Sequence, residues 1–540
     1  MSDTVIRQRA ARPSARLDRL VGCGAPGRPA LTFKAVTVSY GELAAQVACA
    51  AAGLHRLGVR RGDRVAVYAE KRVETVVAML AASAAGAVFV PVNPLFKARH
   101  LAHVVADCAA VAVVTTAERY ETVRTALPAE TSVREVVVVG AGGAPAADDR
   151  WRISPWEELH TAGSAPVPGA DAVIDADTAA IFYTSGSTGG PKGVVLSHRN
   201  LLAGAESVAG YLGHTPDDTL LAVLPLSFDA GFSQLTTSLI SGAHVVLTNY
   251  LVPRDVVRLC ARHAVTGLTC VPPLWLQLVG QEWPAEATAH LRYFANTGGR
   301  MPRAALNRLR ALFPQAEPYL MYGLTEAFRS TFLDPAQVER RPDSIGKAVP
   351  NARVLVVREG GTPCSPDEPG ELVHVGACVT LGYWNDTART AQRYRPSPEA
   401  KAGGAPRDVA VWSGDLVRRD NEGFLYFIAR NDAQIKSSGY RISPEEIEET
   451  IHASGLVVEA VALGIPDEEL GEAVALLVVL AGGSGVDNLR DWCMQRLPRY
   501  MVPRDIVSCP EIPRNPNGKF DRVALRTALA SFGRTSGEKS

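Results

Sequence analysis

The sequence shows no excess of charge of either sign. Its 540 residues include 56 Lys and Arg and 56 Asp and Glu, which gives a formal net charge of +0. Proteins that bind nucleic acid or an anionic membrane by charge usually carry a basic surface, so we expect neither partner. Hydrophobic residues make up 47% and charged residues 21%, as in ordinary globular proteins. The length predicts several packed units.

A long apolar run is also missing. The longest one, residues 78–92, is interrupted by Ser83 and Gly86 and is too short to cross a bilayer. It is typical of a buried helix that leads into a core strand at residues 88–90. The N-terminus has no apolar signal-peptide core either, and its basic stretch is predicted to be a disordered leader. That stretch contains Arg7, Arg9, Arg12 and Arg16.

The nine cysteines form no pattern that indicates a disulfide framework or a metal site. They are scattered, their number is odd, and no C-x-x-C pair or zinc-ligand spacing occurs. We therefore expect reduced, mostly buried thiols in a cytoplasmic protein. No internal repeat of solenoid or propeller length is present either.

The first part of the chain alternates predicted strands and helices. This β-α-β order predicts mostly parallel sheets covered by helices. The elements we expect are helices at residues 40–57 and 74–85 and strands at 64–68, 111–115 and 136–139. Two stretches rich in Gly, Ala and Pro, residues 140–149 and 395–407, are predicted to be surface loops.

The pattern changes near residue 430. A helix at residues 444–452, strands at 459–464 and 473–480, a helix at 488–497 and a tail follow, which indicates a small α+β unit. We therefore predict an α/β protein with two domains. Residues 1–430 form a large domain of helix-covered, mostly parallel sheets, and residues 431–540 form a small α+β domain.

The strongest motif is a loop rich in glycine and hydroxyl groups between two predicted strands, residues 179–182 and 194–196. Its backbone N–H groups, its hydroxyls and the Lys192 ammonium suit a polyphosphate, and its glycines allow the positive φ angles of an anion nest. The P-loop of nucleotide hydrolases does not fit, because Pro191 and Gly193 replace its Gly and Ser/Thr. The predicted phosphate ligands are Thr184, Ser185, Gly186, Ser187, Thr188, Gly189 and Lys192.

This loop, TSGSTGGPKG, resembles the phosphate loop of the adenylate-forming (AMP-binding) superfamily. That family contains acyl-CoA synthetases, stand-alone and nonribosomal-peptide adenylation enzymes, and luciferases. The resemblance continues in order along nearly the whole chain. It rests on NTGG at residues 296–299, YGLTE at 322–326, SGD at 413–415, Arg430, SGYR at 438–441 and PRNPNGK at 513–519.

The resemblance implies ATP and Mg²⁺ as cofactors and gives roles to the matching residues. Gly298 and Gly299 are expected to lie against adenine and ribose, and Tyr322 to stack on adenine. Thr325 is expected to contact phosphate and Glu326 to hold Mg²⁺, since a hard cation prefers carboxylate and phosphate oxygens. Asp415 and Arg430 are expected to bind the ribose. The family usually has Gly before that arginine, where this chain has Ala429.

In the small domain, the resemblance implies a mobile unit with a catalytic lysine. Lys519 is expected to bridge the carboxylate and the α-phosphate while the acyl-adenylate forms. Asp432 matches the hinge position, where a large backbone change is tolerated. Rotation about this hinge is expected to replace Lys519 with the face that carries Gly439, which leaves room for the pantetheine arm of the acceptor thiol.

The acid substrate is less clearly indicated. The segment LPLSFDAG at residues 224–231 places Phe228 where acyl-CoA synthetases often have a gating residue. It also gives the Phe-Asp pair whose carboxylate binds the amino group in amino-acid adenylation domains. Asp229 favours an amino acid, unless it merely caps the following helix. Arg329 is expected either to meet a second substrate carboxylate or to pair with Asp229, which would weigh against an amine. The predicted pocket residues are Phe228, Asp229, Cys270, Ala295, Thr297, Met321, Arg329 and Ser330.

We therefore expect a ligase that activates a small carboxylic acid with ATP, releases pyrophosphate and passes the acyl group to a thiol. The acceptor is CoA or the phosphopantetheine of a discrete acyl or peptidyl carrier protein, because no carrier domain or D-S-L motif follows Lys519. The alternatives are an acyl-CoA ligase for a fatty or aryl acid, a luciferase-like oxygenase, and a non-catalytic scaffold on the same fold. The last would have lost residues such as Lys192 and Lys519, which are intact.

Overall fold

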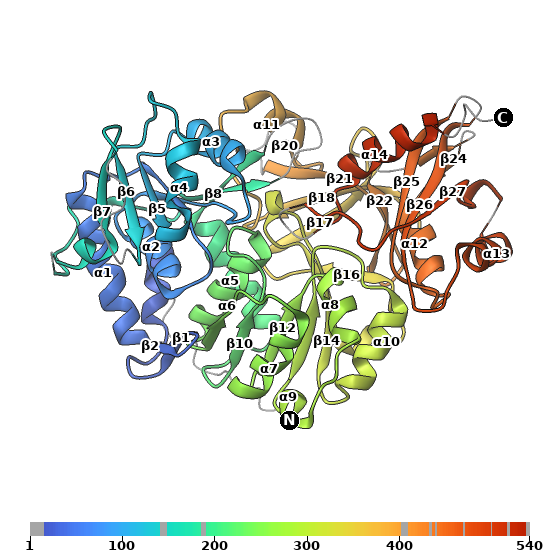
Figure 1. Ribbon diagram of the computed structural model, residues 1–540, viewed down its shortest axis with the longest axis horizontal. Helices are drawn as coiled ribbons and strands as arrows, with labels where there is room; N and C mark the ends of the chain where they lie inside the picture. The colour runs from blue at the N-terminus through green and yellow to red at the C-terminus, as the bar shows by residue number, and fades with distance from the viewer. Residues whose placement is uncertain are drawn as a thin grey trace.

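The computed structural model describes residues 16–140, 148–161, 163–184, 191–400, 409–430, 435–437, 440–467, 470–497, 499–515 and 519–535. The described residues form three sheets, two of them in a large N-terminal part and one in a small C-terminal part (Figure 1). The α/β architecture with a large and a small domain was predicted from the sequence, and it is confirmed. The proposed boundary at residues 431–432 lies outside the described residues, so it stays a prediction.

The first sheet has eight strands and is parallel through its middle. Its order is β19-β9-β8-β4-β3-β5-β6-β7, and the contacts among β8, β4, β3, β5, β6 and β7 are all parallel. The strands are β3 (Arg64–Tyr68), β4 (Val88–Pro91), β5 (Ala112–Thr116), β6 (Glu135–Val139), β7 (Arg152–Pro155), β8 (Thr178–Thr184), β9 (Lys192–Ser197) and β19 (Gly382–Tyr383). The strands predicted in this region are present, within two residues of their expected bounds.

Helices cover this sheet, as the alternating pattern predicts. They are α1 (Tyr40–Arg56), α2 (Val73–Ala84), α3 (Ala98–Asp107) and α4 (Ala117–Ala126). Helix α1 begins with a capping box, in which the Ser39 hydroxyl accepts from the Glu42 N–H and the Glu42 carboxylate accepts from the Ser39 N–H. Helix α2 leads into β4, so the longest apolar run is a buried helix and strand. None of the described helices is long and apolar enough for a membrane span.

The second sheet has 14 strands and continues from a parallel half into an antiparallel half. Its main order is β17-β18-β21-β22-β16-β15-β14-β13-β12-β10-β11-β1-β2, with β20 on β21. The half that includes the parallel strands contains β1 (Pro29–Phe33), β2 (Val36–Ser39), β10 (Thr219–Ala222), β11 (His244–Leu247), β12 (Gly267–Cys270), β13 (Tyr293–Asn296) and β14 (Glu317–Tyr322). The antiparallel half contains β15 (Thr331–Leu333), β16 (Ser344–Ala348), β17 (Ala352–Val357), β18 (Gly370–Gly376), β20 (Tyr394–Pro396), β21 (Val409–Arg419) and β22 (Leu425–Arg430).

The helices of this region are α5 (His198–Tyr211), α6 (Asp229–Ile240), α7 (Pro253–His263), α8 (Pro272–Val279), α9 (Ala285–Thr288), α10 (Arg303–Leu312) and α11 (Thr387–Arg393). The predicted loop at residues 395–407 is wrong at its start, because Arg395 and Pro396 pair with β21. The rest of that loop from residue 401, and most of the loop predicted at 140–149, lie outside the described residues.

The small domain is built on a five-stranded sheet. Its elements are β23 (Ile435–Ser437), β24 (Tyr440–Ile442), α12 (Pro444–His452), β25 (Val457–Asp467), β26 (Gly471–Leu480), α13 (Val486–Arg496), β27 (Asp505–Ser508) and α14 (Arg522–Thr535). The predicted helices and strands are present. The predicted tail is wrong, because β27 pairs with β26 in parallel and Leu525 and Leu529 of α14 pack against β25 and β26.

Charged side chains join the two domains beside α10. The Glu449 carboxylate of α12 accepts a hydrogen bond from the Arg303 backbone N–H at 3.2 Å and lies 4.0 Å from the Arg300 guanidinium. On the large domain, Asp343 pairs with Arg300 at 2.9 Å and also with the Arg303 side chain. Figure 1 shows α12 next to α10 at this contact. The contact holds the small domain in the position that the next subsection describes.

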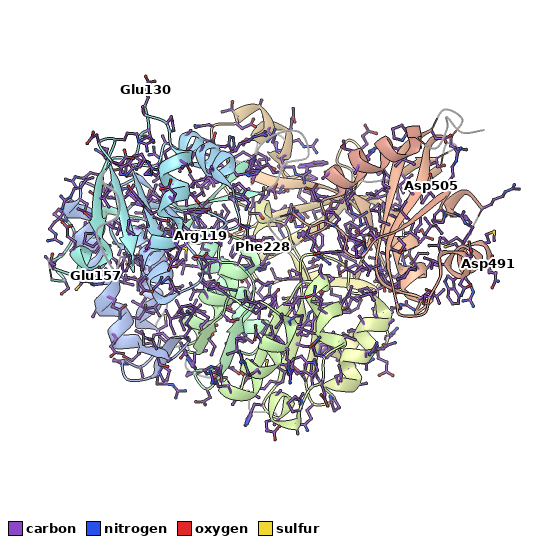
Figure 2. The ribbon with its side chains drawn as sticks, in the orientation of Figure 1. Arg119, Glu130, Glu157, Phe228, Asp491 and Asp505 are labelled. Atoms are coloured by element: carbon purple, nitrogen blue, oxygen red, sulfur yellow. The ribbon has the colours of Figure 1, made fainter. Side chains whose placement is uncertain are left out.

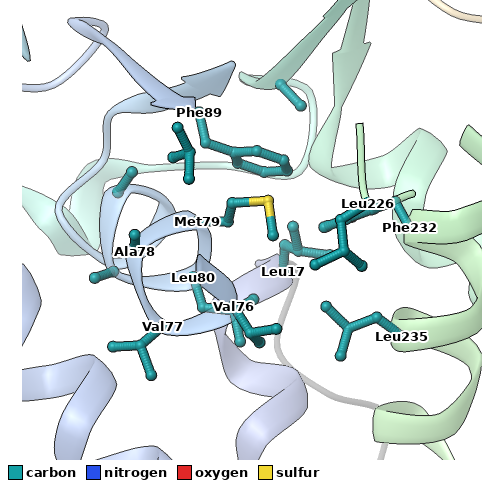
Figure 3. Packing of buried hydrophobic residues seen from close by; sticks show 14 of the residues in the cluster. Leu17, Val76, Val77, Ala78, Met79, Leu80, Phe89, Leu226, Phe232 and Leu235 are labelled. Carbon is teal, nitrogen blue, oxygen red and sulfur yellow. The ribbon is translucent and has the colours of Figure 1, made fainter. Parts of the chain in front are cut away.

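The N-terminal segment enters the core at residue 16. Arg16 is buried and pairs with Asp18 at 3.0 Å, and the Leu17 N–H donates to the His198 imidazole at 3.1 Å. Figure 3 shows Leu17 among side chains of α2 and α6, with Met79 and Leu235 close by. The predicted disordered leader is therefore wrong for Arg16, while residues 1–15 lie outside the described residues. All nine cysteines are free, and most of them are buried, as predicted.

Lys71 ties the first sheet to the second. It is buried, and its ammonium donates to three backbone carbonyls, those of Ala222 at 2.9 Å, Val223 at 2.7 Å and Leu224 at 3.0 Å. The three acceptors match the three N–H bonds of an ammonium group. They also belong to the segment that leads from β10 to Phe228 and Asp229, so Lys71 supports the backbone next to the predicted acyl pocket.

We expect Lys71→Met to lower the free energy of unfolding by about 2–4 kcal/mol, because three buried carbonyls lose their charged donor. Urea unfolding followed by tryptophan fluorescence measures this difference. Lys97→Met is the matched control, since Lys97 is exposed and should change stability by less than about 0.5 kcal/mol. Equal unfolding midpoints for the two variants would show that the Lys71 contacts contribute nothing net.

Candidate active site

The predicted site residues converge between the two domains. Strands β13 and β14 end at Asn296 and Tyr322, and the glycine-rich loop connects the antiparallel strands β8 and β9. Figure 2 places Phe228 near the middle of the large domain, close to Arg119 in this view. Ligand sites of α/β proteins commonly lie at the carboxyl ends of parallel strands. Residues 185–190, which include Ser185, Gly186, Ser187, Thr188 and Gly189, lie outside the described residues.

Glu326 and Lys192 form a buried ion pair. The Lys192 ammonium lies 2.7 Å from a Glu326 carboxylate oxygen, and the Tyr383 hydroxyl donates to the same oxygen at 2.6 Å. Burial alone would raise the pKa of Glu326, but Lys192 and Tyr383 outweigh burial and hold the pKa at about 2. The carboxylate is therefore ionised at neutral pH. Tyr383 lies on β19, a strand from a distant part of the chain that pairs with β9. No local sequence pattern therefore indicated this contact.

Tyr322, Asp415 and Arg430 form a second group of predicted residues. The Tyr322 hydroxyl donates to one Asp415 oxygen, and the Arg430 guanidinium donates to the other at 3.1 Å. Asp415 and Arg430 are opposite each other in the β21–β22 ladder. Burial and the neighbouring carboxylate raise the pKa of Tyr322, so its phenol stays neutral. Thr325 is buried in the turn that follows β14 and carries Glu326.

Lys519 of the small domain reaches the large domain. Its ammonium lies 5.3 Å from the centre of the Phe228 ring and 3.8 Å from the position that a Cβ on Gly298 would occupy. Gly298 has a φ of +78°, so its backbone conformation favours glycine, while a Cβ here would make only ordinary van der Waals contact with Lys519. Burial lowers the pKa of Lys519, and Asp229 is the strongest of the carboxylates that oppose this shift. The neighbouring residues 516–518 lie outside the described residues.

The two charged residues predicted for the acyl pocket lie together. Arg329 and Asp229 are each 5% exposed, and the guanidinium lies 3.9 Å from an Asp229 carboxylate oxygen. Arg329 also donates to the Asp229 carbonyl at 3.3 Å and to the Ser233 hydroxyl at 3.4 Å. Helix α6 begins at Asp229 itself, and no side chain caps it, so the helix-cap interpretation is wrong.

A small cavity opens beside Arg329, between α5, α6 and the parallel strands. Its volume is about 20 Å³, which is close to the space of one water molecule. Its wall includes the predicted residues Thr297, Met321 and Arg329. The sequence did not indicate the other wall residues, which include Ser233, His214, Tyr293, Thr237 and Thr269. Cys270, Ala295 and Ser330 are buried nearby but do not line the cavity.

Several buried polar atoms at this centre have no hydrogen-bond partner among the described residues. They are Thr184 Oγ1, Asn296 Oδ1, Ser330 Oγ, both ring nitrogens of His374 and Arg393 Nε. Buried polar groups in folded proteins are normally satisfied, so these atoms are suited to a polar ligand. The described residues contain no group of three or more acidic, His or Cys side chains that would hold a metal alone. A cation on Glu326 therefore needs further oxygens from a ligand such as a nucleotide phosphate.

The hinge and thioester residues are not described. Asp432 and Gly439 both lie in the gaps after residue 430, so their roles stay predictions. Gly299 is described and stands next to Gly298, where its carbonyl accepts from the Asn296 amide at 2.8 Å.

Comparison with known proteins identifies relatives along nearly the whole chain. The profile described as AMP-binding enzyme matches residues 23–384, and the profile of the AMP-binding enzyme C-terminal domain matches residues 446–519. An L-proline--[L-prolyl-carrier protein] ligase of Streptomyces coelicolor is 34% identical over 532 residues, which cover 95% of this chain and 96% of the relative. A feruloyl-CoA synthase of an Amycolatopsis species is 31% identical, and the match covers 93% of this chain and 96% of the relative.

The structure is also similar to solved structures. The crystal structure of ATP-bound MatB from Rhodopseudomonas palustris superimposes with a TM-score of 0.84 at 26% sequence identity. The match covers 96% of this chain and 99% of the other. The two-part architecture is therefore shared with a protein whose structure was solved with ATP bound.

Proposed function

This chain belongs to the AMP-binding enzyme family, and we propose that it activates a small amino or imino acid with ATP and transfers it to the thiol of a carrier protein. The general reaction class follows from the family and its relatives. The protein is an ATP-dependent, AMP-forming ligase that joins a carboxylic acid to a thiol. The choice of acid and of thiol is the part that we propose.

The first half-reaction joins two anions, so the site has to neutralise charge. A carboxylate oxygen attacks the α-phosphorus, a C–O–P anhydride forms, and the bond to the β-phosphate oxygen breaks as pyrophosphate leaves. We assign Lys519 to the incoming carboxylate and the α-phosphate, because its ammonium lies beside both Gly298 and Phe228. Such positioned charge stabilises the developing transition state without a covalent enzyme intermediate.

Glu326 and Lys192 fit the triphosphate end of the nucleotide. A bound Mg²⁺ would supply further charge neutralisation on the phosphate oxygens, and Glu326 would hold it. Lys192 follows the glycine-rich loop and lies 2.7 Å from Glu326, so a cation and a carboxylate stand together at this end. We assign Tyr322 to adenine and Asp415 with Arg430 to the ribose hydroxyls, as their hydrogen-bonded cluster would allow.

In the second half-reaction the thiol sulfur attacks the acyl carbon. The C–S bond forms, the C–O bond to AMP breaks, and the thiol proton passes to solvent. We propose that residues 431–540 rotate about Asp432 for this step, which removes Lys519 and brings in Gly439. The proposal is supported by the polar nature of the contact between Glu449 and the start of α10, since hydrogen bonds and ion pairs there can be exchanged for water.

The observation that carries the amino-acid proposal is the state of the Asp229 carboxylate. It is buried, and among the described residues its carboxylate oxygens make one ion contact, to Arg329 at 3.9 Å, and no hydrogen bond. A buried carboxylate in this state can still accept hydrogen bonds, and a substrate ammonium would supply them. The cavity of about 20 Å³ is lined by its ion partner Arg329 but not by Asp229, and its size favours a small side chain. The prolyl-carrier protein ligase that is 34% identical supports an imino or amino acid as well.

A non-amino acid is the second candidate, and Arg329 is the observation that favours it. If Arg329 neutralises Asp229, the pocket has no net charge to attract an ammonium group. The feruloyl-CoA synthase among the relatives supports this alternative and points to CoA as the acceptor. The two candidates differ in the effect that they predict for Asp229.

Pyrophosphate exchange over a panel of acids tests the proposal. We expect exchange with proline or another small amino acid, and a loss of kcat/KM of roughly 10²-fold or more in Asp229→Ala, because a buried charge pair loses one partner. Asp217→Ala is the control, since that side chain is 85% exposed. Exchange with aryl or fatty acids alone, or amino-acid exchange that survives in Asp229→Ala, would contradict the proposal. Thioester formation with CoA and with a carrier protein, measured in parallel, identifies the acceptor.

A further inference from the structure

We propose that Arg393 binds the β- and γ-phosphates of ATP, as a second cation of the polyphosphate site beside Lys192. The inference rests on the proposed use of ATP at this site. It adds a residue that none of the sequence motifs contains, because Arg393 lies between the YGLTE and SGD segments in the sequence.

The fold directs Arg393 into the nucleotide site. It is the last residue of α11, and its Nη1 atom lies 2.7 Å from the position that a Cβ on Gly414 would take. Gly414 has a φ of +67° and precedes Asp415, the residue assigned to the ribose. A side chain at position 414 would collide with the guanidinium, so the glycine makes room for Arg393 as well as for the turn.

Among the described residues, the Arg393 guanidinium has no hydrogen-bond or ion-pair partner. Its Nε atom is buried without a hydrogen-bond partner, and no ion pair or hydrogen bond joins Arg393 to another residue in the described ranges. Two nearby arginines have acidic partners: Arg389 pairs with Asp386 at 3.4 Å, and Arg395, whose Nε also lacks a hydrogen-bond partner, lies 3.8 Å from Glu371. A partly buried arginine is commonly matched by a carboxylate or phosphate, so Arg393 lacks an anion that a ligand can supply.

The electrostatic neighbours of Arg393 locate that anion. Burial opposes the ionisation of Glu326, but Lys192, Tyr383 and then Arg393 lower its pKa. Arg393 also opposes the rise in the pKa of Tyr322 that burial and Asp415 cause. The guanidinium lies beside Gly414, within electrostatic reach of both Tyr322 and the Glu326 carboxylate assigned to Mg²⁺.

Neither His374 nor Glu326 forms a hydrogen bond or ion pair with Arg393. Burial, with a smaller effect from Arg393 itself, lowers the pKa of His374 to about 3, so the imidazole is neutral at pH 7. His374 stacks on Tyr322 with ring centres 6.2 Å apart. The Glu326 oxygen that faces the site is already shared by Lys192 and Tyr383. Around Glu326, the two cations Lys192 and Arg393 thus stand against one carboxylate, which suits a highly anionic triphosphate.

The choice of the β- and γ-phosphates follows from the positions of the lysines. Lys519 approaches from the side of Gly298 and Phe228, where the acid has to meet the α-phosphorus. Arg393 acts on Glu326, which pairs with Lys192 next to the glycine-rich loop. Arg393, Glu326 and Lys192 therefore define the end of the site at which pyrophosphate forms.

Nucleotide binding without acid substrate tests the assignment. The wild type, Arg393→Gln and Arg393→Lys are titrated with ATP, AMP and pyrophosphate in the presence of Mg²⁺, and Kd is measured by calorimetry. We expect Arg393→Gln to weaken ATP and pyrophosphate roughly 10–100-fold, as for the loss of a charge-assisted contact, and to leave AMP binding within about twofold. Arg393→Lys should give an intermediate loss, because it keeps the charge without the fork geometry.

Arg389→Gln is the matched control on the same helix, and it should bind all three ligands like the wild type. Equal weakening of ATP and AMP, or unchanged ATP binding, would overturn the assignment of Arg393. If Arg393→Gln binds none of the ligands because it does not fold, the ATP-to-AMP ratio of Arg393→Lys decides. A wild type that binds ATP but releases no pyrophosphate with any acid would contradict the proposed function, while the effect of Arg393 on ATP binding would still stand.

Discussion

Replacing Lys519 with alanine is expected to slow adenylate formation by roughly 10²–10³-fold and to leave thioester formation from supplied acyl-adenylate almost unchanged. The Lys519 ammonium lies between Gly298 and Phe228, where the acid meets the nucleotide. In the proposed mechanism its charge is needed only while the carboxylate attacks the α-phosphorus. The second half-reaction breaks a different bond, in an arrangement that we propose has removed Lys519 from the site.

Two assays separate these effects. Pyrophosphate release measures the first half-reaction, and thioester formation from chemically prepared adenylate measures the second. Lys347→Ala serves as the control, because Lys347 is exposed in β16 and lies over the Phe424 ring, away from the site. An equal loss of both half-reactions in Lys519→Ala would refute the role assigned to this lysine.

Glu326→Gln is expected to lower kcat/KM for adenylate formation by about 10²-fold or more, since it removes the charge that is proposed to hold Mg²⁺ and that pairs with Lys192. The pKa of Glu326 is held at about 2, so this carboxylate is charged throughout the range in which the assay is practical. The contribution of its charge to stability is present above its ordinary pKa, and it is lost only as the pH falls toward 2. Activity that declines between pH 5 and 6 therefore has another cause.

The dependence of the rate on Mg²⁺ is the specific measurement for Glu326. The glutamine variant should need a higher Mg²⁺ concentration for half-maximal rate, whereas a purely structural loss would lower the rate at every concentration alike. Glu339→Gln is the control, because that side chain is 88% exposed. An unchanged Mg²⁺ requirement in Glu326→Gln would place the metal elsewhere.

The sequence predicted elements that depend on local patterns. The strand at residues 64–68 and the helix at 444–452 have the bounds expected of them, because hydrophobic periodicity and end signals lie within each element. Strand β27 and helix α14 were missed, because each is stabilised by contacts with strands formed much earlier in the chain. Arg16 was misjudged for the same reason, since its partners include the carbonyl of Ala170.

The site residues fall into the same two groups: those that local motifs identify and those that contacts with distant parts of the chain bring to the site. Tyr322, Glu326, Asp415, Arg430 and Lys519 stand in recognisable motifs, and the structure brings them together. The residues missed were Tyr383, Arg393, His374, His214 and Tyr293. Each of them reaches the site through strand order or helix packing, and a tyrosine, arginine or histidine on its own carries no motif. The pairing of Asp229 with Arg329 was one of two outcomes left open, because it depends on the fold of residues 100 positions apart.

If the small cavity beside Arg329 receives the acid side chain, as we propose, its size limits how faithfully the enzyme can choose its acid. A pocket that selects by size gains only about 1–3 kcal/mol from excluding one extra methylene, which corresponds to roughly 10–200-fold discrimination. Selection by size also fails to reject smaller acids, because they fit into the same cavity. A polar wall with Ser233, Thr237 and Tyr293 can instead discriminate by unpaired hydrogen-bonding groups. Misactivated acids that pass this filter would have to be removed after activation, by hydrolysis of the adenylate or by refusal at the acceptor.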